Sequence, residues 1–305
     1  MSIKKLWFKL THSPKKWHYL EYWPELRLER QQQSETLIFQ NNLKISSRNV
    51  DELKALFTAQ TVFLVGAGPS INEQNLAPLK SSQTLFLNGA LSLLESHQLK
   101  PSAVLIIDKG FIQRHQHFLR LIPVGTPCIF TLGVVRQILR FEPEFFEARP
   151  LYLIEKASKP YGRPALTTAQ LDAHYFAKSE DVACSLDIKK GFAEAGTVMY
   201  VAAQLMLYWR AQTIILVGFD LGNAQQPRFY ETQQSRAKNK SGLEKALHAR
   251  ILPAFTLFKK LCDERGIQLT NASHLSQMPY DIIPFNPVLL PQNGAMNTSS
   301  SQVSE

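Results

Sequence analysis

Short runs of apolar residues recur along the chain, and each run ends in small or polar residues. The first, Thr61–Val65, is made only of apolar and β-branched residues, which is typical of a strand buried on both faces of a parallel sheet. We predict further strands at 84–88, 103–108, 128–132, 151–154, 213–217 and 267–271. Strands that alternate with helices indicate βαβ units, so the predicted fold is α/β with a doubly wound, mostly parallel, Rossmann-like sheet.

The segments between these runs are helical or irregular. Helices are expected at about 71–79, 90–97, 197–210 and 243–265, with a basic helix after residue 108. Residues 156–192 break the pattern; such a segment is usually a lid or a poorly ordered loop, and we favour a lid-like insertion. The predicted organisation is a basic, aromatic arm (1–50), one domain (51–286) and a disordered polar tail (287–305).

The first predicted strand runs directly into the turn Gly66-Ala67-Gly68-Pro69-Ser70. Ser70 can cap the helix that is predicted to follow. A helix N-terminus presents free N–H groups and the positive end of the helix dipole, which together hold phosphate. The turn therefore indicates a nucleotide or nucleotide-sugar site, although a tight corner that needs glycine is the simpler explanation.

The dinucleotide-binding fingerprint does not fit this turn. Its third glycine would fall at position 71, which is Ile71, and its ribose-binding acid would end the second strand. That strand ends instead in Asn88-Gly89. We therefore expect a nucleotide other than NAD.

Polar residues follow several other predicted strands, and ligands of open parallel sheets bind at the carboxyl ends of strands. Besides the turn at 66–70, these residues are Asn88-Gly89, Asp108, Asp220 and Asn271. Each alone is explained by a turn or a helix cap. Together they predict a polar rim with a phosphate cradle and two carboxylates. No Walker A lysine, G-x-S-x-G or H-E-x-x-H motif supports an NTPase, a hydrolase or a zinc protease.

Composition narrows the class of protein further. The 305 residues carry a formal charge of +9, which favours an anionic partner. No apolar run reaches the roughly 18 residues of a membrane-spanning helix, and the N-terminus does not resemble a secretory signal. The isolated Cys128, Cys184 and Cys262 fit buried thiols in a reducing cytoplasm.

Lysines and aromatic residues are interleaved in the first 20 residues. This pattern suits an anionic membrane surface, while an arm packed on the domain is the simpler alternative. We expect no nucleic-acid partner, because no known nucleic-acid-binding signature is present. The residues concerned are Lys4, Lys5, Trp7, Phe8, Lys9, Lys15, Lys16, Trp17 and Tyr19.

Over roughly residues 60–286, the chain resembles the third-Kdo transferases of lipopolysaccharide core biosynthesis. More distantly it is similar to bacterial CMP-sialic-acid-dependent sialyltransferases and to flagellin-glycosylation and pterin-pyrophosphokinase-like proteins. The motifs are short, and their order carries the resemblance. They are Val65–Ser70, Leu87–Ala90, Ile106–Asp108, Gly218–Leu221, Arg228–Tyr230, Ile251–Pro253 and Tyr280–Phe285.

The resemblance implies a GT-A-like variant of the fold and an inverting transfer of Kdo, an acidic 2-keto sugar, from CMP-Kdo to an inner-core sugar of lipopolysaccharide. The turn that contains Gly66, Gly68, Pro69 and Ser70 could stabilise the CMP phosphate, together with Asn88-Gly89, Arg228 and Tyr230. Gly196-Thr197 matches the pair that opens a helix beside the donor in the sialyltransferases.

A base must remove the proton of the acceptor hydroxyl. His248 lies near the position of the histidine of the sialyltransferases, and Asp108 or Asp220 could serve instead. No metal is required by this reasoning, and a bound Mg²⁺ is left open.

The acceptor implies a cytoplasmic protein, peripheral on the inner membrane. Another CMP-sugar transferase, a pterin pyrophosphokinase and a catalytically silent membrane-associated scaffold remain alternatives.

Overall fold

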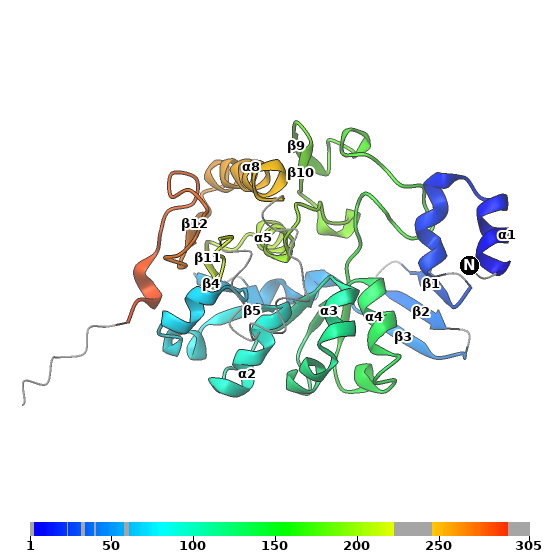
Figure 1. Ribbon diagram of the computed structural model, residues 1–305, viewed down its shortest axis with the longest axis horizontal. Coiled ribbons are helices and arrows are strands. Elements are labelled where there is room, and N and C mark those ends of the chain that lie inside the picture. The colour runs from blue at the N-terminus through cyan, green and yellow to red at the C-terminus, as the bar shows by residue number, and fades with distance from the viewer. Residues whose placement is uncertain are drawn as a thin grey trace, which may run out of the picture.

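A computed structural model describes residues 3–22, 24–31, 34–39, 41–57, 61–222 and 246–291. Its centre is a mixed sheet with the strand order β1-β2-β3-β8-β7-β6-β5-β4-β11-β12, parallel from β3 onward (Figure 1). The strands are β1 (Leu26–Arg30), β2 (Glu35–Phe39), β3 (Lys44–Ser47), β4 (Thr61–Val65), β5 (Gln83–Leu87), β6 (Ala103–Ile106), β7 (Cys128–Phe130), β8 (Leu151–Leu153), β11 (Thr213–Val217) and β12 (Gln268–Asn271). The predicted α/β fold and every strand predicted for it are confirmed.

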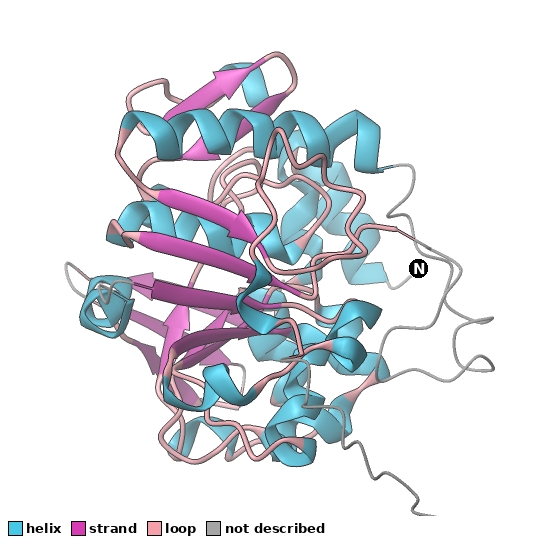
Figure 2. Cartoon of the chain, turned by 90° about the vertical axis from the view of Figure 1, so that its left-hand side faces the viewer, coloured by secondary structure: helices cyan, strands magenta, loops and turns pink. Residues whose placement is uncertain are grey.

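Helices lie on both sides of these strands (Figure 2). The α-helices are α1 (Ile3–Thr11), α2 (Ser92–Ser96), α3 (Lys109–Arg114), α4 (Leu132–Ile138), α5 (Val198–Trp209) and α8 (Leu252–Glu264). The 3₁₀ helices are Pro14–Glu21, Val50–Phe57, Pro69–Glu73, Ala77–Ser81, Asn88–Leu91, Gln116–Leu121, Phe145–Glu147, Thr168–Gln170, Ile188–Lys190 and Pro287–Leu289, and Leu247–Ile251 is a π-helical turn.

The central strands are buried on both faces because their side chains alternate between two apolar layers. In β4, Val62 and Leu64 pack in the layer that contains α5 and α8. Phe63 and Val65 face the layer that contains α2, α3 and α4. This arrangement explains why the strand reads as an unbroken apolar run.

Helix α5 is buried nearly all round, as an apolar helix at the centre of a domain should be. Thr197 caps its N-terminus by accepting a hydrogen bond from the backbone N–H of Met199 at 3.2 Å. Arg210 ends it in the left-handed conformation, with φ 61°. The predicted helix at 197–210 is therefore confirmed.

Several expectations differ from the structure, among them the disordered tail expected at 287–305, of which Pro287–Leu289 form a 3₁₀ helix with Leu289 buried. The helix expected at 71–79 is replaced by two short 3₁₀ helices, Pro69–Glu73 and Ala77–Ser81. Each has a proline in its first turn, and the chain between them is extended at Gln74. Of the helix expected at 243–265, residues 243–245 lie outside the described residues, and the remainder begins with the π-helical turn Leu247–Ile251.

Another difference lies in residues 26–47, which we expected to belong to an arm and which form β1, β2 and β3. These strands make an antiparallel meander, and β3 joins the main sheet where Ser47 pairs with Leu151. In β1, Leu26 and Leu28 are buried. The many charges of the segment, on exposed positions such as Arg27, hide this period-two pattern in the sequence.

The segment 156–192, expected to be a lid, contains the hairpin β9 (Phe176–Ser179) and β10 (Val182–Ser185). The side chain of Gln204 in α5 fastens the end of this segment. Its Oε1 accepts from the N–H groups of Ser185 at 2.8 Å and Ala193 at 3.0 Å, and its Nε2 donates to the carbonyl oxygens of Ala193 and Tyr200. The hairpin is thereby tied to the central helix.

Candidate active site

The turn after β4 is bonded to the turn after β11 through its own backbone. The N–H of Gly66 donates to Val217 O at 2.8 Å, and the N–H of Gly68 donates to Gly218 O at 2.9 Å. A β-carbon on Gly68 would lie 2.5 Å from the carboxylate of Asp220 and 2.7 Å from Gly218 O. Glycine is needed here because two backbone turns approach each other closely.

Asp220 completes this contact. Its carboxylate accepts hydrogen bonds from the N–H of Ser70 at 2.7 Å and from the hydroxyl of Ser70 at 2.5 Å. Asp220 is buried, with only 4% of its surface exposed. Pro69 opens the five-residue 3₁₀ helix at this point. The expected phosphate cradle is therefore corrected: the amides of Gly66, Gly68 and Ser70 donate to the protein itself, and no α-helix begins there.

A cavity of about 690 Å³ lies over the carboxyl ends of β5, β6, β7 and β8. It brings together four residues that the sequence predicted, Asn88, Asp108, Gly196 and Thr197. The first two follow β5 and β6, and the others lead into α5. This is the edge of a parallel sheet at which ligands bind.

Asn88 has a strained backbone, with φ 46°. Asparagine tolerates this left-handed region better than most residues, yet the conformation still costs free energy. Its side-chain Oδ1 is buried and has no hydrogen-bond partner among the described residues. A strained residue with an unused acceptor at a cavity wall is suited to receive a ligand donor.

Asp108 caps α3 by accepting from the N–H of Gly110 at 2.8 Å, and it lies 3.4 Å from the guanidinium of Arg114. Its side chain is about half exposed, so a substrate can reach it. The neighbouring wall contains Thr131, whose hydroxyl donates to Ile107 O at 3.1 Å and ties the ends of β6 and β7 together.

The N-terminus of α5 forms another wall. Gly196 has φ 86°, a conformation that favours glycine, and Thr197 follows as the cap. The guanidinium of Arg250 lies 3.6 Å from the position that a β-carbon on Gly196 would take. A twelve-residue helix whose N-terminus borders a cavity offers positive potential to an anion.

The 3₁₀ helix Pro14–Glu21 and its C-cap Tyr22 form a further wall of the cavity through His18, Glu21 and Tyr22. Lys109 pairs with Glu21 at 2.5 Å, and Nε2 of His18 lies 3.2 Å from Pro160 O. Nδ1 of His18 is buried without a partner among the described residues. Burial, reinforced by Glu21, raises the pKa of the Tyr22 phenol, so its hydroxyl stays a neutral donor.

The remaining predicted residues lie elsewhere. Gly89 is buried behind Asn88, and its carbonyl accepts from the hydroxyl of Ser92 at 3.0 Å. His248 is exposed in the π-helical turn and does not line the cavity. Arg228 and Tyr230 lie outside the described residues. Within the part of the chain that the structure describes, no three His, Cys, Asp or Glu side chains cluster as metal ligands would.

Several lining residues were missed. Glu155 follows the strand predicted at 151–154, so the strand-end rule that selected Asn88 and Asp108 could have found it. Thr131 lies within the strand predicted at 128–132, and it was missed because the observed strand β7 ends earlier, at Phe130. His18 and Tyr22 reach the cavity only through tertiary packing of a distant segment, and no local pattern indicates it.

The fold and the cavity define an α/β protein with a candidate ligand site at the carboxyl edge of its sheet. Residues 37–226, more than half of the chain, match the family described as 6-hydroxymethylpterin diphosphokinase MptE-like, and the chain belongs to that family. Residues 170–288 match 3-deoxy-D-manno-octulosonic acid transferase WaaZ, which supports a glycosyltransferase-like protein without assigning donor or acceptor.

None of the curated proteins compared with the chain matches it. Among solved structures, the chain is similar to the MAf glycosyltransferase from Magnetospirillum magneticum AMB-1, with 13% sequence identity and a TM-score of 0.39. The similarity covers 75% of this chain and 37% of that chain.

Proposed function

We propose that the protein is an inverting glycosyltransferase that moves Kdo (3-deoxy-D-manno-octulosonic acid) from CMP-Kdo to an inner-core sugar of lipopolysaccharide. The observation that carries the proposal is the convergence of Asn88, Asp108, Gly196 and Thr197 on one cavity. The match of residues 170–288 to a Kdo transferase family supports the choice of donor.

In this proposal CMP occupies the cavity with its phosphate at the N-terminus of α5. That helix end takes the role of phosphate site that we first expected for the turn at 66–70. In that turn the amides of Gly66, Gly68 and Ser70 already donate hydrogen bonds within the protein. Oδ1 of Asn88 accepts a hydrogen bond from the nucleotide, and the guanidinium of Arg250 lies near Gly196 at the start of α5.

Asp108 is the base of the proposed reaction, because it is the one of the three predicted candidates that lines the cavity. Its carboxylate takes the proton of the acceptor hydroxyl while the hydroxyl oxygen bonds to the anomeric carbon. The bond from that carbon to the phosphate oxygen breaks, and its electron pair leaves with CMP. We propose that no metal is needed, and unchanged turnover in EDTA tests this.

The membership in the diphosphokinase-like family favours a second function, transfer of pyrophosphate to a pterin. A pyrophosphokinase binds ATP with Mg²⁺ in preference to CMP, so calorimetry with both nucleotides separates the two proposals.

We also propose that α1 contacts the anionic surface of the inner membrane from the cytoplasm. Leu10 is 79% exposed and Trp7 56% exposed, and Lys9 and Lys15 lie close in sequence. Pro14–Glu21 packs on the domain, because Lys15 O accepts from the N–H of Ala165 at 2.8 Å. Among the described helices, none is long and apolar enough to span a bilayer.

The proposed function is tested by adding CMP to the purified protein and by measuring Kdo transfer to a lipid A–core acceptor. We expect CMP to raise the melting temperature, and Asp108→Asn to lower kcat at least 100-fold while CMP still binds. If CMP does not raise the melting temperature and the protein transfers no Kdo, the proposal is wrong. Unchanged cell-surface glycolipid after Asn88→Ala and Asp108→Asn would favour a silent scaffold.

A further inference from the structure

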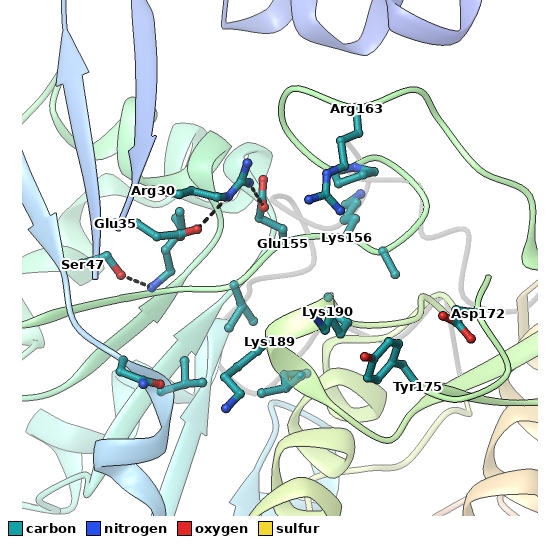
Figure 3. Close-up of a pocket in the computed structure, with 18 of the residues that line it drawn as sticks. Arg30, Glu35, Ser47, Glu155, Lys156, Arg163, Asp172, Tyr175, Lys189 and Lys190 are labelled. Carbon is teal, nitrogen blue, oxygen red and sulfur yellow. Dashed lines mark hydrogen bonds and ion pairs between the residues drawn. The ribbon is translucent and has the colours of Figure 1, made fainter. Parts of the chain in front are cut away.

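A second cavity, of about 640 Å³, lies on the other side of the chain segment that follows β8. Its walls come from the meander β1–β3, from the loop at 155–172 and from the 3₁₀ helix Ile188–Lys190 (Figure 3). No residue predicted from the sequence as a site residue lines it.

The lining of this second cavity is strongly cationic. It contains six cations against three carboxylates, Glu35, Glu155 and Asp172. The first cavity has three lysines against four carboxylates. The six cations are Arg30, Arg48, Lys156, Arg163, Lys189 and Lys190.

The cations differ in how they are paired. Arg30 bridges Glu35 and Glu155, and Lys189 binds Asp51 at 2.9 Å. Arg163 and Lys190 form no ion pair with any carboxylate of the described residues. Figure 3 shows these two side chains on different segments around the same space. Arg48 has no carboxylate partner among the described residues either, so three of the six cations leave positive charge available to a ligand.

The cavity also has an apolar and aromatic side. Lys190 lies 4.9 Å from the ring centre of Tyr175, and Leu171 and Phe176 line the same wall. A pyranose ring presents apolar C–H faces together with hydroxyl groups. Cations beside an aromatic and apolar wall therefore suit a sugar that carries an acidic group.

The two cavities share one wall. Ile154, Glu155 and Lys156 line both of them, so a ligand in one lies next to a ligand in the other. Adjoining cavities can hold two substrates side by side, and a transfer requires in addition that the acceptor hydroxyl extend past this wall to Asp108, which lines the first cavity and not the second.

We propose that the second cavity binds the acceptor, and that the acceptor is an anionic saccharide bearing phosphate or carboxylate. The inference rests on the proposed transferase function for its chemistry. Arg163 and Lys190 bind the acidic group, and the wall with Tyr175 contacts the sugar ring.

The test is an NMR titration of the ¹⁵N-labelled full chain with glucose 6-phosphate, glucuronate and glucose. We expect saturable shifts near 160–163 and 188–191 with one or both acidic sugars, and glucose binding at least about tenfold more weakly. Comparing phosphate with carboxylate identifies the preferred acidic group.

The double variant Arg163→Ala/Lys190→Ala should weaken binding of the acidic sugars at least about tenfold. Its matched control is Lys80→Ala/Lys100→Ala, which removes the same charge from exposed positions outside both cavities and should bind as the wild type does. Equal binding of glucose, or equal loss in both double variants, would overturn the inference.

CMP binding distinguishes this inference from the proposed function. CMP affinity that persists in Arg163→Ala/Lys190→Ala, with acidic-sugar binding lost, supports two separate sites. If CMP binds and no acidic sugar does, the inference alone fails. If acidic sugars bind at the second cavity and CMP does not bind, the proposed function fails and the anion site stands.

Discussion

Asp220 accepts two hydrogen bonds from Ser70, one from its N–H and one from its hydroxyl. The pair joins the turns that follow β4 and β11. These neighbouring strands are where the strand order reverses, since β5–β8 lie on one side of β4, and β11 and β12 lie on the other. A ligand would be expected in a crevice at this switch point. The protein's own carboxylate occupies the position that an anionic ligand would take, which moves the candidate site toward β5–β8.

A structural role for Asp220 makes a prediction about its variants. Asp220→Ala leaves two buried donors of Ser70 unsatisfied and should lower the free energy of unfolding by about 2–5 kcal/mol. Asp220→Asn can still accept from the N–H and donate to the hydroxyl, so it should lose less. Urea unfolding measures both. A wild-type stability for Asp220→Ala would contradict the structural role.

Gly68 should tolerate no side chain. A β-carbon there meets the carboxylate of Asp220 at 2.5 Å and Gly218 O at 2.7 Å, so Gly68→Ala should destabilise the fold by about 1–3 kcal/mol. Gly110→Ala is the control, because its nearest neighbour is the movable end of Arg114 and it lies in α3. Melting temperatures should fall only for Gly68→Ala.

Asn88 should separate stability from binding. Glycine adopts φ 46° without strain, so Asn88→Gly should keep the melting temperature at or above the wild-type value. It also removes the unpaired Oδ1, and CMP affinity should fall about tenfold. Calorimetry and thermal unfolding of one preparation measure both. Unchanged CMP affinity would remove Asn88 from the binding site.

Membrane contact by α1 predicts a selective effect of Leu10. In flotation with phosphatidylglycerol vesicles, Leu10→Ser should reduce binding several-fold, because an exposed apolar side chain no longer enters the interface. Leu275→Ser is the matched control, since Leu275 is 45% exposed on a distant loop. Equal binding to phosphatidylcholine vesicles would argue against an electrostatic contribution.

The hydrogen bond from the Tyr208 hydroxyl to Asp51 predicts a pH dependence. Burial, together with Asp51, raises the pKa of Tyr208 from 10.0 to about 12. The unfolded chain therefore releases this proton at lower pH than the folded chain, so stability is lost as pH rises from 10 toward 12. Tyr208→Phe should be less stable than the wild type at pH 8, and the difference should shrink at pH 11. Urea unfolding at both pH values tests this.

The sequence predicts the central strands well, because each is buried on both faces and therefore reads as an apolar run. It misses β1–β3, where charged residues such as Arg27 occupy the exposed positions of a half-buried meander. The helix expected at 71–79 fails for a local reason, since two prolines favour separate 3₁₀ turns.

The residues of the candidate site likewise fall into those that the sequence predicts and those that it does not. Asn88, Asp108, Gly196 and Thr197 meet because strand ends of a parallel sheet converge, and that convergence follows from the predicted topology. Asp220 was expected to act on a ligand, but in the structure it binds Ser70. The two residues are 150 positions apart in the chain, so no local sequence pattern predicts their contact. The same holds for His18 and Tyr22, which reach the cavity from another part of the chain.

The hydrogen bonds of the Gln204 side chain affect how tightly a ligand can bind in the cavity at the N-terminus of α5. One buried amide connects the hairpin, the chain before Gly196 and helix α5, so these parts cannot fluctuate independently. The wall formed by the α5 N-terminus is therefore preorganised, and the loss of conformational entropy occurs when the protein folds and not when a ligand arrives. Improved binders can be sought among rigid ligands that match this fixed wall.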